Sequence, residues 1–318
     1  MATILAILGG ARKKGFTGRL LDSAIEGATT VGGVEVDRVY LLDFQPPITP
    51  CISCFECWRS PGRGCILKDA LGMEGNGDLY RRMKKANGII LADPVHMHGP
   101  SSGTHVFMER CYPFVPKDEL NGVPFASISC ASSGGWMHTA TREICRWAFC
   151  LHFKYLVGLP VHAIYHEEAL EEARFLGRDV AEAALTDERE GRKIMTYEET
   201  WLHYADKPWS MLEPCLHNIT RGTFRWEDSL IEYGLRRGKL KKEEAIALLE
   251  KARKKLIEAV NAYRLNDLTL ATKRLAEANT FWGNASDKEF FEENIVPWKM
   301  PDDVVYLKLP TETEKCGG

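Results

Sequence analysis

The sequence predicts an α/β protein in which a doubly wound, five-stranded parallel sheet is followed by a C-terminal helical extension. Over residues 1–185, five short apolar segments alternate with five segments of helical periodicity. Runs such as ATILAIL and GIILA lack the polar alternation of a half-exposed strand, as expected for strands buried on both faces. Beyond residue 185 the alternation stops, and charge-rich helical patterns replace it.

The predicted strands and helices follow one another in order along the first domain. Strands are expected at residues 2–8, 34–42, 88–95, 123–130 and 156–165. Helices are expected at residues 20–28, 78–86, 103–114, 140–153 and 166–185. Sheets of this kind bind ligands at the carboxyl ends of their strands, so the loops that follow the strands are the expected binding site.

Residues 186–318 are expected to form a helical extension that acts as a lid or in oligomerisation. Helical patterns occupy residues 240–265, with Glu-to-Lys pairs at helical spacing, and residues 268–283. The stretch before them is polar but carries six aromatic residues: Tyr197, Trp201, Tyr204, Trp209, Phe224 and Trp226. Such a cluster is expected to be buried against the rim of the ligand pocket or a neighbouring subunit. The alternative is a separately folded helical module.

The composition is that of an ordinary globular protein, with 45% hydrophobic and 27% charged residues. A net charge of −3 gives no attraction to nucleic acid or to a membrane surface, and no apolar run could span a bilayer. The first apolar run has no basic segment before it, so we interpret it as a strand and expect a cytoplasmic protein. Ten cysteines in such a chain indicate reduced or metal-bound thiols.

The first loop, GGARKKGFTG at residues 9–18, lies between a predicted strand and a predicted helix. Backbone amides at a helix N-terminus bind anions, and an arginine can contact a phosphate through two hydrogen bonds. The spacing is neither that of a P-loop nor that of a dinucleotide-binding loop. An ordinary turn with solvated lysines is the alternative. The candidate phosphate-binding residues are Gly10, Arg12, Gly15, Phe16 and Thr17.

The loops after the third and fourth strands are rich in small and polar residues, and either could lie along a flat heterocycle. Together with a phosphate-binding first loop they meet the requirements of FMN. The candidate ring-binding residues are Pro94, Val95, His96, Met97, His98, Gly99, Ser132, Ser133, Gly134, Gly135 and Trp136. His96, His98 and His138 are candidates for proton transfer, although a loop histidine can equally be structural.

Four cysteines, Cys51, Cys54, Cys57 and Cys65, are spaced C-x2-C-x2-C-x7-C in the loop at residues 50–65. Zinc sites usually use two separated C-x2-C pairs, whereas closely successive cysteines are typical of [4Fe–4S] clusters. We therefore favour a [4Fe–4S] cluster, with zinc and metal-free thiols as alternatives. The remaining cysteines are scattered and are interpreted as small buried hydrophobic residues.

These motifs resemble those of the iron–sulfur flavoproteins, which belong to the flavodoxin-like superfamily of NAD(P)H-dependent FMN reductases. The family's first loop typically reads GSPRKNGNT, and residues 9–17 here read GGARKKGFT. Its flavin loop reads like PVYFGSVSAQLKALIDR and aligns without a gap with PVHMHGPSSGTHVFMER at residues 94–110. The compact cysteine motif, matched by residues 51–69, is the most specific part of a resemblance that covers residues 1–185.

The resemblance implies a flavodoxin-like fold and an oxidoreductase in which FMN exchanges electrons with the cluster. It also implies NAD(P)H as a candidate donor, small molecules or a protein such as a ferredoxin as partners, and a homodimer or homotetramer. The chain departs from the family at Gly10, Phe16, His96 and His105, so FMN binding is expected through the backbone and Arg12. The alternatives are a cluster-free reductase of FMN, quinones or nitro compounds, and a non-enzymatic electron carrier.

Overall fold

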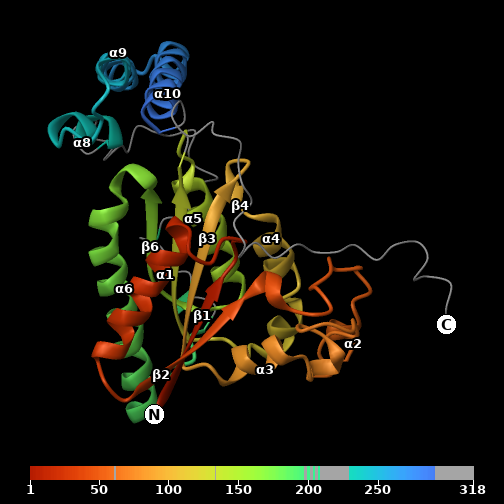
Figure 1. Cartoon of the computed structure of the whole chain (residues 1–318). Coiled ribbons are helices and arrows are strands. Elements are labelled where there is room, and N and C mark those ends of the chain that lie inside the picture. Colours follow the sequence, from red (N-terminus) through yellow and green to blue (C-terminus); the bar gives the residue numbers. More distant parts are fainter. Residues whose placement is uncertain are drawn as a thin grey trace, which may run out of the picture.

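The computed structural model describes residues 1–60, 62–132, 134–196, 199–200, 203–204, 207 and 229–290. A twisted sheet crosses the centre of the molecule with helices on both faces, and the C-terminal helices lie at one end of it (Figure 1). Its five parallel strands are β1 (Ala2–Leu8), β2 (Val34–Tyr40), β3 (Gly88–His96), β5 (Pro124–Ala131) and β6 (Lys154–His162). The strand order β2-β1-β3-β5-β6 is that of a flavodoxin-like sheet and confirms the predicted fold class.

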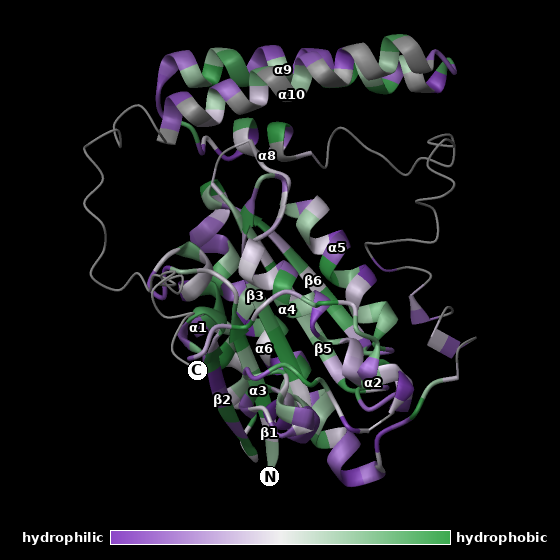
Figure 2. Ribbon diagram, turned by 90° about the vertical axis from the view of Figure 1, so that its right-hand side faces the viewer, coloured by the Kyte–Doolittle hydropathy of each residue, from purple (hydrophilic) through white to green (hydrophobic). Residues whose placement is uncertain are grey.

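Strands β1, β3 and β5 read as nearly unbroken apolar runs because both of their faces are buried, whereas the edge strand β2 alternates and is mostly half-exposed. In β1, Leu5 and Ile7 point into one core, and Ile4, Ala6 and Leu8 point into the other. Helices α1 (Phe16–Thr30) and α6 (His166–Glu190) cover the second core. Helices α3 (Asp78–Lys85), α4 (Ser102–Glu109) and α5 (Met137–Cys150) cover the first, and Figure 2 shows the apolar strands between the two layers.

The remaining described elements are short. The cysteine loop contains the one-turn helix α2 (Glu56–Arg59). Four 3₁₀ segments occur at η1 (Leu41–Asp43), η2 (Met73–Gly75), η3 (Tyr112–Lys117) and η4 (Ala163–Tyr165). The two-residue strand β4 (Gly99–Pro100) pairs antiparallel with the end of β3. It was not predicted, because two residues leave no periodic signal.

The chain remains packed on the α/β domain for some distance beyond the end of α6. Tyr204 is fully buried in the core beneath α5, and its hydroxyl donates to the Phe153 carbonyl at 2.8 Å. Asn121 accepts a hydrogen bond from the Met195 amide at 2.9 Å and donates to the Met195 carbonyl at 2.8 Å. Tyr204 is thus buried, as expected of these aromatic residues, but in the main core and not at the rim of the ligand pocket. The other five, at positions 197, 201, 209, 224 and 226, lie outside the described residues.

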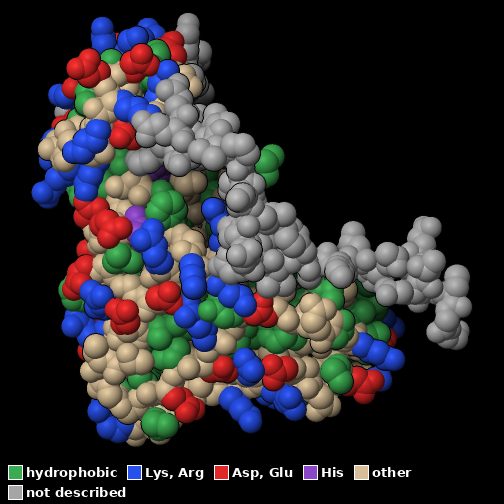
Figure 3. All heavy atoms as spheres, in the orientation of Figure 1, with side chains coloured by type: hydrophobic (Ala, Val, Ile, Leu, Met, Phe, Trp, Pro, Cys, Tyr) green, Lys and Arg blue, Asp and Glu red, His purple; other side chains and the backbone are tan. Residues whose placement is uncertain are grey.

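The extension contains α8 (Leu230–Arg236) and two long helices, α9 (Glu243–Arg264) and α10 (Leu268–Phe290), that pack side by side (Figures 1 and 2). Figure 3 shows both acidic and basic side chains on the surface of these helices. They lie at the carboxyl end of the sheet, where Ile164 joins their apolar core. Tyr165 packs edge-on against Tyr233, and the rings of His162 and Trp282 lie 5.2 Å apart. Within the part of the chain that the structure describes, no helix has the length and apolar character needed to cross a membrane.

Candidate functional site

A cavity of about 150 Å³ opens at the carboxyl ends of β1, β3 and β5. It brings together three loops that are far apart in the sequence, as the fold predicts. Nine predicted cofactor residues line it: Gly10, Arg12, Gly15, Phe16, Thr17, Pro94, Val95, His96 and Ser132. Ala11, Cys130 and Ala131 complete the lining and were not predicted. Cys130 is buried there beside Thr17, and burial raises the pKa of its thiol to about 11.

The first loop can approach β3 because it begins with two glycines. A Cβ atom at Gly9 would lie 1.9 Å from Thr104 Oγ1, and one at Gly10 would lie 2.9 Å from the Pro94 ring. Helix α1 starts immediately after Gly15, which has no side chain to cap it. Its first amides therefore face the cavity end of the loop, where the helix dipole favours an anion. Thr17, which is buried, adds a hydroxyl in the same turn.

A buried carboxylate fixes the loop after β3. Asp93 has no exposed surface and accepts hydrogen bonds from the Ser101 amide at 2.7 Å, the Ser101 hydroxyl at 2.6 Å and the Thr104 hydroxyl at 2.6 Å. Burial raises the pKa of Asp93, and these hydrogen bonds act in the opposite direction. The residue ties the end of β3 to the start of α4. Sequence reasoning missed it, although an aspartate inside an apolar strand was the available signal.

The β3–β4 connection is a tight hairpin in which His96 pairs with Gly99. Its two turn residues, Met97 and His98, have φ angles of 47° and 70°, which are costly for residues other than glycine. The His98 ring stacks on Trp136 at 4.4 Å, so this hairpin contacts the loop after β5. Met97 is almost fully exposed.

The structure separates the three candidate histidines. His96 lines the cavity, His98 stacks on Trp136, and His138 is exposed in the first turn of α5. Ser133 lies outside the described residues. The remaining predicted ring-binding residues flank the cavity without lining it: Met97, His98, Gly99, Gly134, Gly135 and Trp136.

All four cysteines of the loop line a second, small cavity of about 20 Å³. Burial raises the pKa of Cys57, and so do the neighbouring thiols of Cys65, Cys51 and Cys54, as expected for sulfurs held close to one another. Among the described residues, no three histidine, cysteine or acidic side chains are arranged to hold a metal ion. The four sulfurs therefore surround one space without converging on one point.

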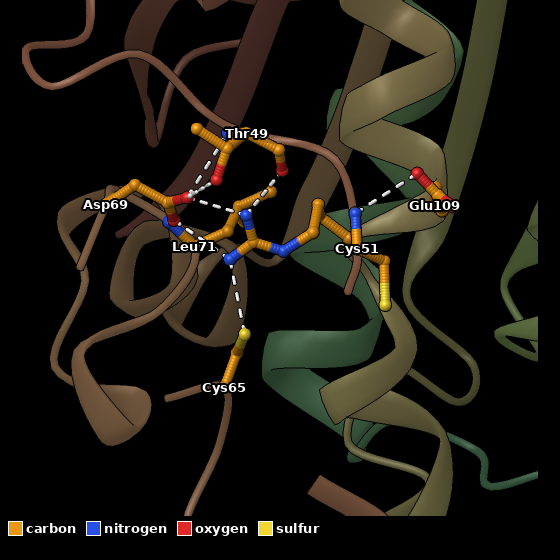
Figure 4. Close-up of polar contacts among 7 residues, drawn as sticks. Thr49, Cys51, Cys65, Asp69, Leu71 and Glu109 are labelled. Carbon is orange, nitrogen blue, oxygen red and sulfur yellow. Dashed lines mark hydrogen bonds and ion pairs between the residues drawn. The ribbon is translucent and has the colours of Figure 1, made fainter. Parts of the chain in front are cut away.

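A buried ion pair between Arg110 and Asp69, whose hydrogen bonds are drawn in Figure 4, borders this second cavity through Arg110. Arg110 follows the last residue of α4 and is 1% exposed, and its partner Asp69 is 3% exposed. The guanidinium donates to both Asp69 oxygens, at 2.6 and 3.0 Å, and to the Cys65 sulfur at 3.2 Å. Burial alone would raise the pKa of Asp69, but Arg110 and the Thr49 and Leu71 amides lower it. No pattern in the sequence indicates that either charge is buried.

The chain matches the family of NADPH-dependent FMN reductases over residues 2–160. It is 29% identical over 195 residues to an iron–sulfur flavoprotein of Methanocaldococcus jannaschii, covering 56% of this chain and 95% of that protein. It is 34% identical over 71 residues to an iron–sulfur flavoprotein of Archaeoglobus fulgidus, covering 22% of this chain and 33% of that one. A solved flavone reductase is 20% identical with a TM-score of 0.44, covering 61% of this chain and 66% of that chain.

These matches confirm the resemblance that the loop motifs indicate, and they favour the enzymatic interpretation over a non-enzymatic carrier. The family match ends near the carboxyl end of β6 and so includes every strand that contributes to the 150 Å³ cavity. The chain belongs to the NADPH-dependent FMN reductase family and is a flavin-dependent oxidoreductase.

Proposed function

We propose that the protein is an iron–sulfur flavoprotein oxidoreductase that holds FMN in the 150 Å³ cavity and a [4Fe–4S] cluster on its cysteine loop. The observation that carries this proposal is that Cys51, Cys54, Cys57 and Cys65 line one cavity. Bound FMN would take two electrons from a donor and release them singly, and a cluster would pass them on one at a time. Two electrons leave the donor and two reach the acceptor, so no further reductant is needed.

Two features of the cavity support FMN as its occupant. Thr17, Arg12 and the first amides of α1 suit a single phosphate group, and a dinucleotide loop is missing from the sequence. Pro94, Val95, His96 and Ser132 also line the cavity, and we propose that the flat ring lies against them. Gly10 and Phe16 replace side chains of the family pattern that could contact phosphate, so Arg12 and the backbone carry that contact.

Arg12→Ala is expected to weaken FMN binding about tenfold. A hydrogen bond to a charged group is worth ~1.5–3 kcal/mol, and the exposure of Arg12 places the effect at the low end. FMN affinity is measured by quenching of flavin fluorescence with apoprotein. Lys14→Ala is the matched control, because Lys14 lies in the same loop but does not line the cavity. Equal affinities of the two variants would remove Arg12 from the phosphate site.

The cysteine cavity suits a cluster in its donor set and its surroundings. Cys51, Cys54, Cys57 and Cys65 supply one thiolate for each iron of a cubane, which is the ligand count of a [4Fe–4S] centre. The buried Arg110 guanidinium compensates negative charge at Cys65. The cluster-free reductase remains the alternative, and iron and sulfide analysis separates the two.

Turnover experiments test which molecule donates electrons to the flavin and which class of acceptor receives them. We propose NADH or NADPH as the donor, and anaerobic mixing with either is expected to bleach the flavin absorption. Steady turnover with a quinone or nitro compound would support a reductase of small molecules. The flavin could instead be reduced without such turnover, with turnover beginning only when a ferredoxin-like protein is added. That result would support a relay of electrons to a protein partner.

Large apolar side chains are exposed around the cysteine loop. Ile52, Phe55, Trp58 and Tyr112 are 45–61% exposed, an unusual number of large apolar side chains for one small loop region. We propose that this surface is covered in a homodimer or homotetramer, or when a protein partner docks. Because this surface lies beside the four cysteines, a subunit or protein bound to the surface would lie near the cluster.

We also propose that the extension narrows access to the flavin. Trp282 of α10 is buried, and its Nε1 lies 3.7 Å from where a Cβ of Gly135 would be. Gly135 adjoins Trp136, which stacks on His98 of the β3–β4 hairpin. A chain of contacts therefore runs from α10 to both loops expected to hold the ring. Ser132, in the same loop, lines the cavity itself.

Trp282→Ala is expected to raise KM for the acceptor and to broaden the range of acceptors, with FMN affinity unchanged. The reason is that removing the indole frees the residue 134–136 loop without altering the phosphate site. Leu270→Ala, at an exposed position of α10, is the control. Unchanged KM values for several acceptors of different size would count against a role of the extension at the flavin edge.

A further inference from the structure

We infer that Arg110 and Asp69 form a positioning pair that sets the reduction potential of the cluster, with opposite effects of the two residues. The inference rests on the proposed function, because it concerns the group that the four cysteines would hold. The Arg110 guanidinium donates to both the Asp69 carboxylate and the Cys65 sulfur, and Figure 4 draws these hydrogen bonds as dashed lines.

The first step is that Arg110 has almost no access to water. It is 1% exposed, and its two terminal nitrogens have four acceptors within 3.2 Å. Nη1 donates to the Thr49 carbonyl and to Asp69 Oδ2, both at 2.6 Å. Nη2 donates to Asp69 Oδ1 at 3.0 Å and to Cys65 Sγ at 3.2 Å. The fork geometry of arginine thus points one hydrogen bond at the sulfur.

The second step is electrostatic. Reduction adds one negative charge to a cluster, and a buried cation close to one of its sulfurs stabilises that charge more than a solvated cation could. Hydrogen bonds to the sulfurs also raise the potential of such clusters. Arg110 therefore favours the reduced form. Asp69, 3% exposed on the other side of the guanidinium, opposes it with a buried negative charge.

The third step links this pair to the flavin cavity. Arg110 directly follows α4, and the first residues of that helix are held by Asp93 through Ser101 and Thr104. A helix of eight residues spans about 12 Å. The same helix also presents Glu109, whose carboxylate accepts from the Cys51 amide at 3.2 Å. Helix α4 is thus a rigid connection, fixed at one end to the loop after β3 and at the other to two of the four cysteines.

The test uses two variants of similar shape, Arg110→Gln and Asp69→Asn, in the full-length, cluster-loaded protein. The midpoint potential of the cluster is measured by an anaerobic redox titration followed by electron paramagnetic resonance. Arg110→Gln is expected to shift it to more negative values, because it removes a cation. Asp69→Asn is expected to shift it to more positive values. Each shift should reach a tenfold change in the ratio of reduced to oxidised cluster, which is about 59 mV for one electron.

A matched control separates a buried charge from any charge nearby. Arg63 is close to Cys65 in sequence, but its side chain is 47% exposed and pairs with Glu74. Arg63→Gln is expected to shift the potential much less than Arg110→Gln, since water screens its charge. Equal shifts in these two arginine variants would overturn the inference.

A purely structural ion pair makes a different prediction. If the pair only holds the loop in place, both variants lose cluster or shift the potential in the same direction, and the inference is overturned. Should Arg110→Gln fail to fold, Arg110→Lys keeps the charge and is expected to keep the potential closer to that of the wild type than Asp69→Asn does. Wild-type protein without iron would overturn the proposed function as well. If the wild type and both variants contain iron but the variants keep the wild-type cluster potential, this inference alone is overturned.

Discussion

Protein purified without oxygen is expected to contain about four irons and four sulfides per chain, the formula of a [4Fe–4S] cluster, and Cys54→Ala is expected to abolish this content. Cys54 lines the cysteine cavity together with Cys51, Cys57 and Cys65. Alanine provides no ligand, and a cluster bound by three thiolates in a half-exposed loop should not survive purification. Iron and sulfide analysis and the visible spectrum measure the outcome.

FMN content provides the internal reference for this experiment. The residues that line the flavin cavity include none of the four loop cysteines, so Cys54→Ala is expected to retain FMN. Cys150→Ala, at an exposed position of α5, is the matched control and should keep both iron and FMN. Stoichiometric zinc in place of iron would refute the cluster. Iron that persists in Cys54→Ala would refute the assignment of this ligand.

The centre of the sheet was predictable because β1, β3 and β5 are buried on both faces and therefore read as apolar runs. The predicted range of β1 matches Ala2–Leu8 at both ends, and β3 extends one residue beyond its predicted range. The cysteine loop and the phosphate loop were equally accessible, because their signals lie in residue type and short spacing. Such motifs can be identified without knowing which residues pack against them in the folded protein.

Buried charges could not be predicted in the same way. Arg110 and Asp69 are separated by 41 positions, and nothing in the sequence distinguishes them from solvated residues. Their burial depends on how the cysteine loop folds back on α4. The hairpin at Met97 and His98 was missed for another reason: its positive φ angles usually call for asparagine or glycine, and neither residue is present.

The segment after α6 shows a further limit of sequence patterns. Residues 186–204 are polar and carry aromatic residues, and they were assigned to the extension on that basis. Tyr204 nevertheless packs within the main core, and His203 Nε2 lies 2.9 Å from the Tyr155 carbonyl. Only long-range contacts reveal this packing. The division at residue 185 stays a prediction, and these contacts determine how it is best tested.

Ending the chain after residue 207 is expected to leave a stable, FMN-binding domain, whereas ending it after residue 185 is expected to destabilise that domain severely. The shorter fragment loses Tyr204, and removal of a large buried aromatic side chain costs roughly 3–5 kcal/mol. It also loses the paired hydrogen bonds between Asn121 and Met195. Urea denaturation of both fragments gives the difference in the free energy of unfolding.

Two full-length variants show whether Tyr204 accounts for that difference. Tyr204→Phe keeps the ring and removes the hydroxyl that donates to the Phe153 carbonyl, which should cost about 1 kcal/mol, whereas Tyr204→Ala should approach the loss seen in the shorter fragment. Equal stability of the two fragments would contradict this account of Tyr204.

The longer fragment then tests the role of the extension, because it keeps the core and ends before α8–α10, the helices that pack on Ile164 and Tyr165. If the extension narrows access to the flavin, this fragment should bind FMN as the full chain does but accept bulkier acceptors. If acceptor preference and oligomeric state are both unchanged, the three helices form a separate module. In that case Trp282 and Gly135 are neighbours without consequence for the reaction.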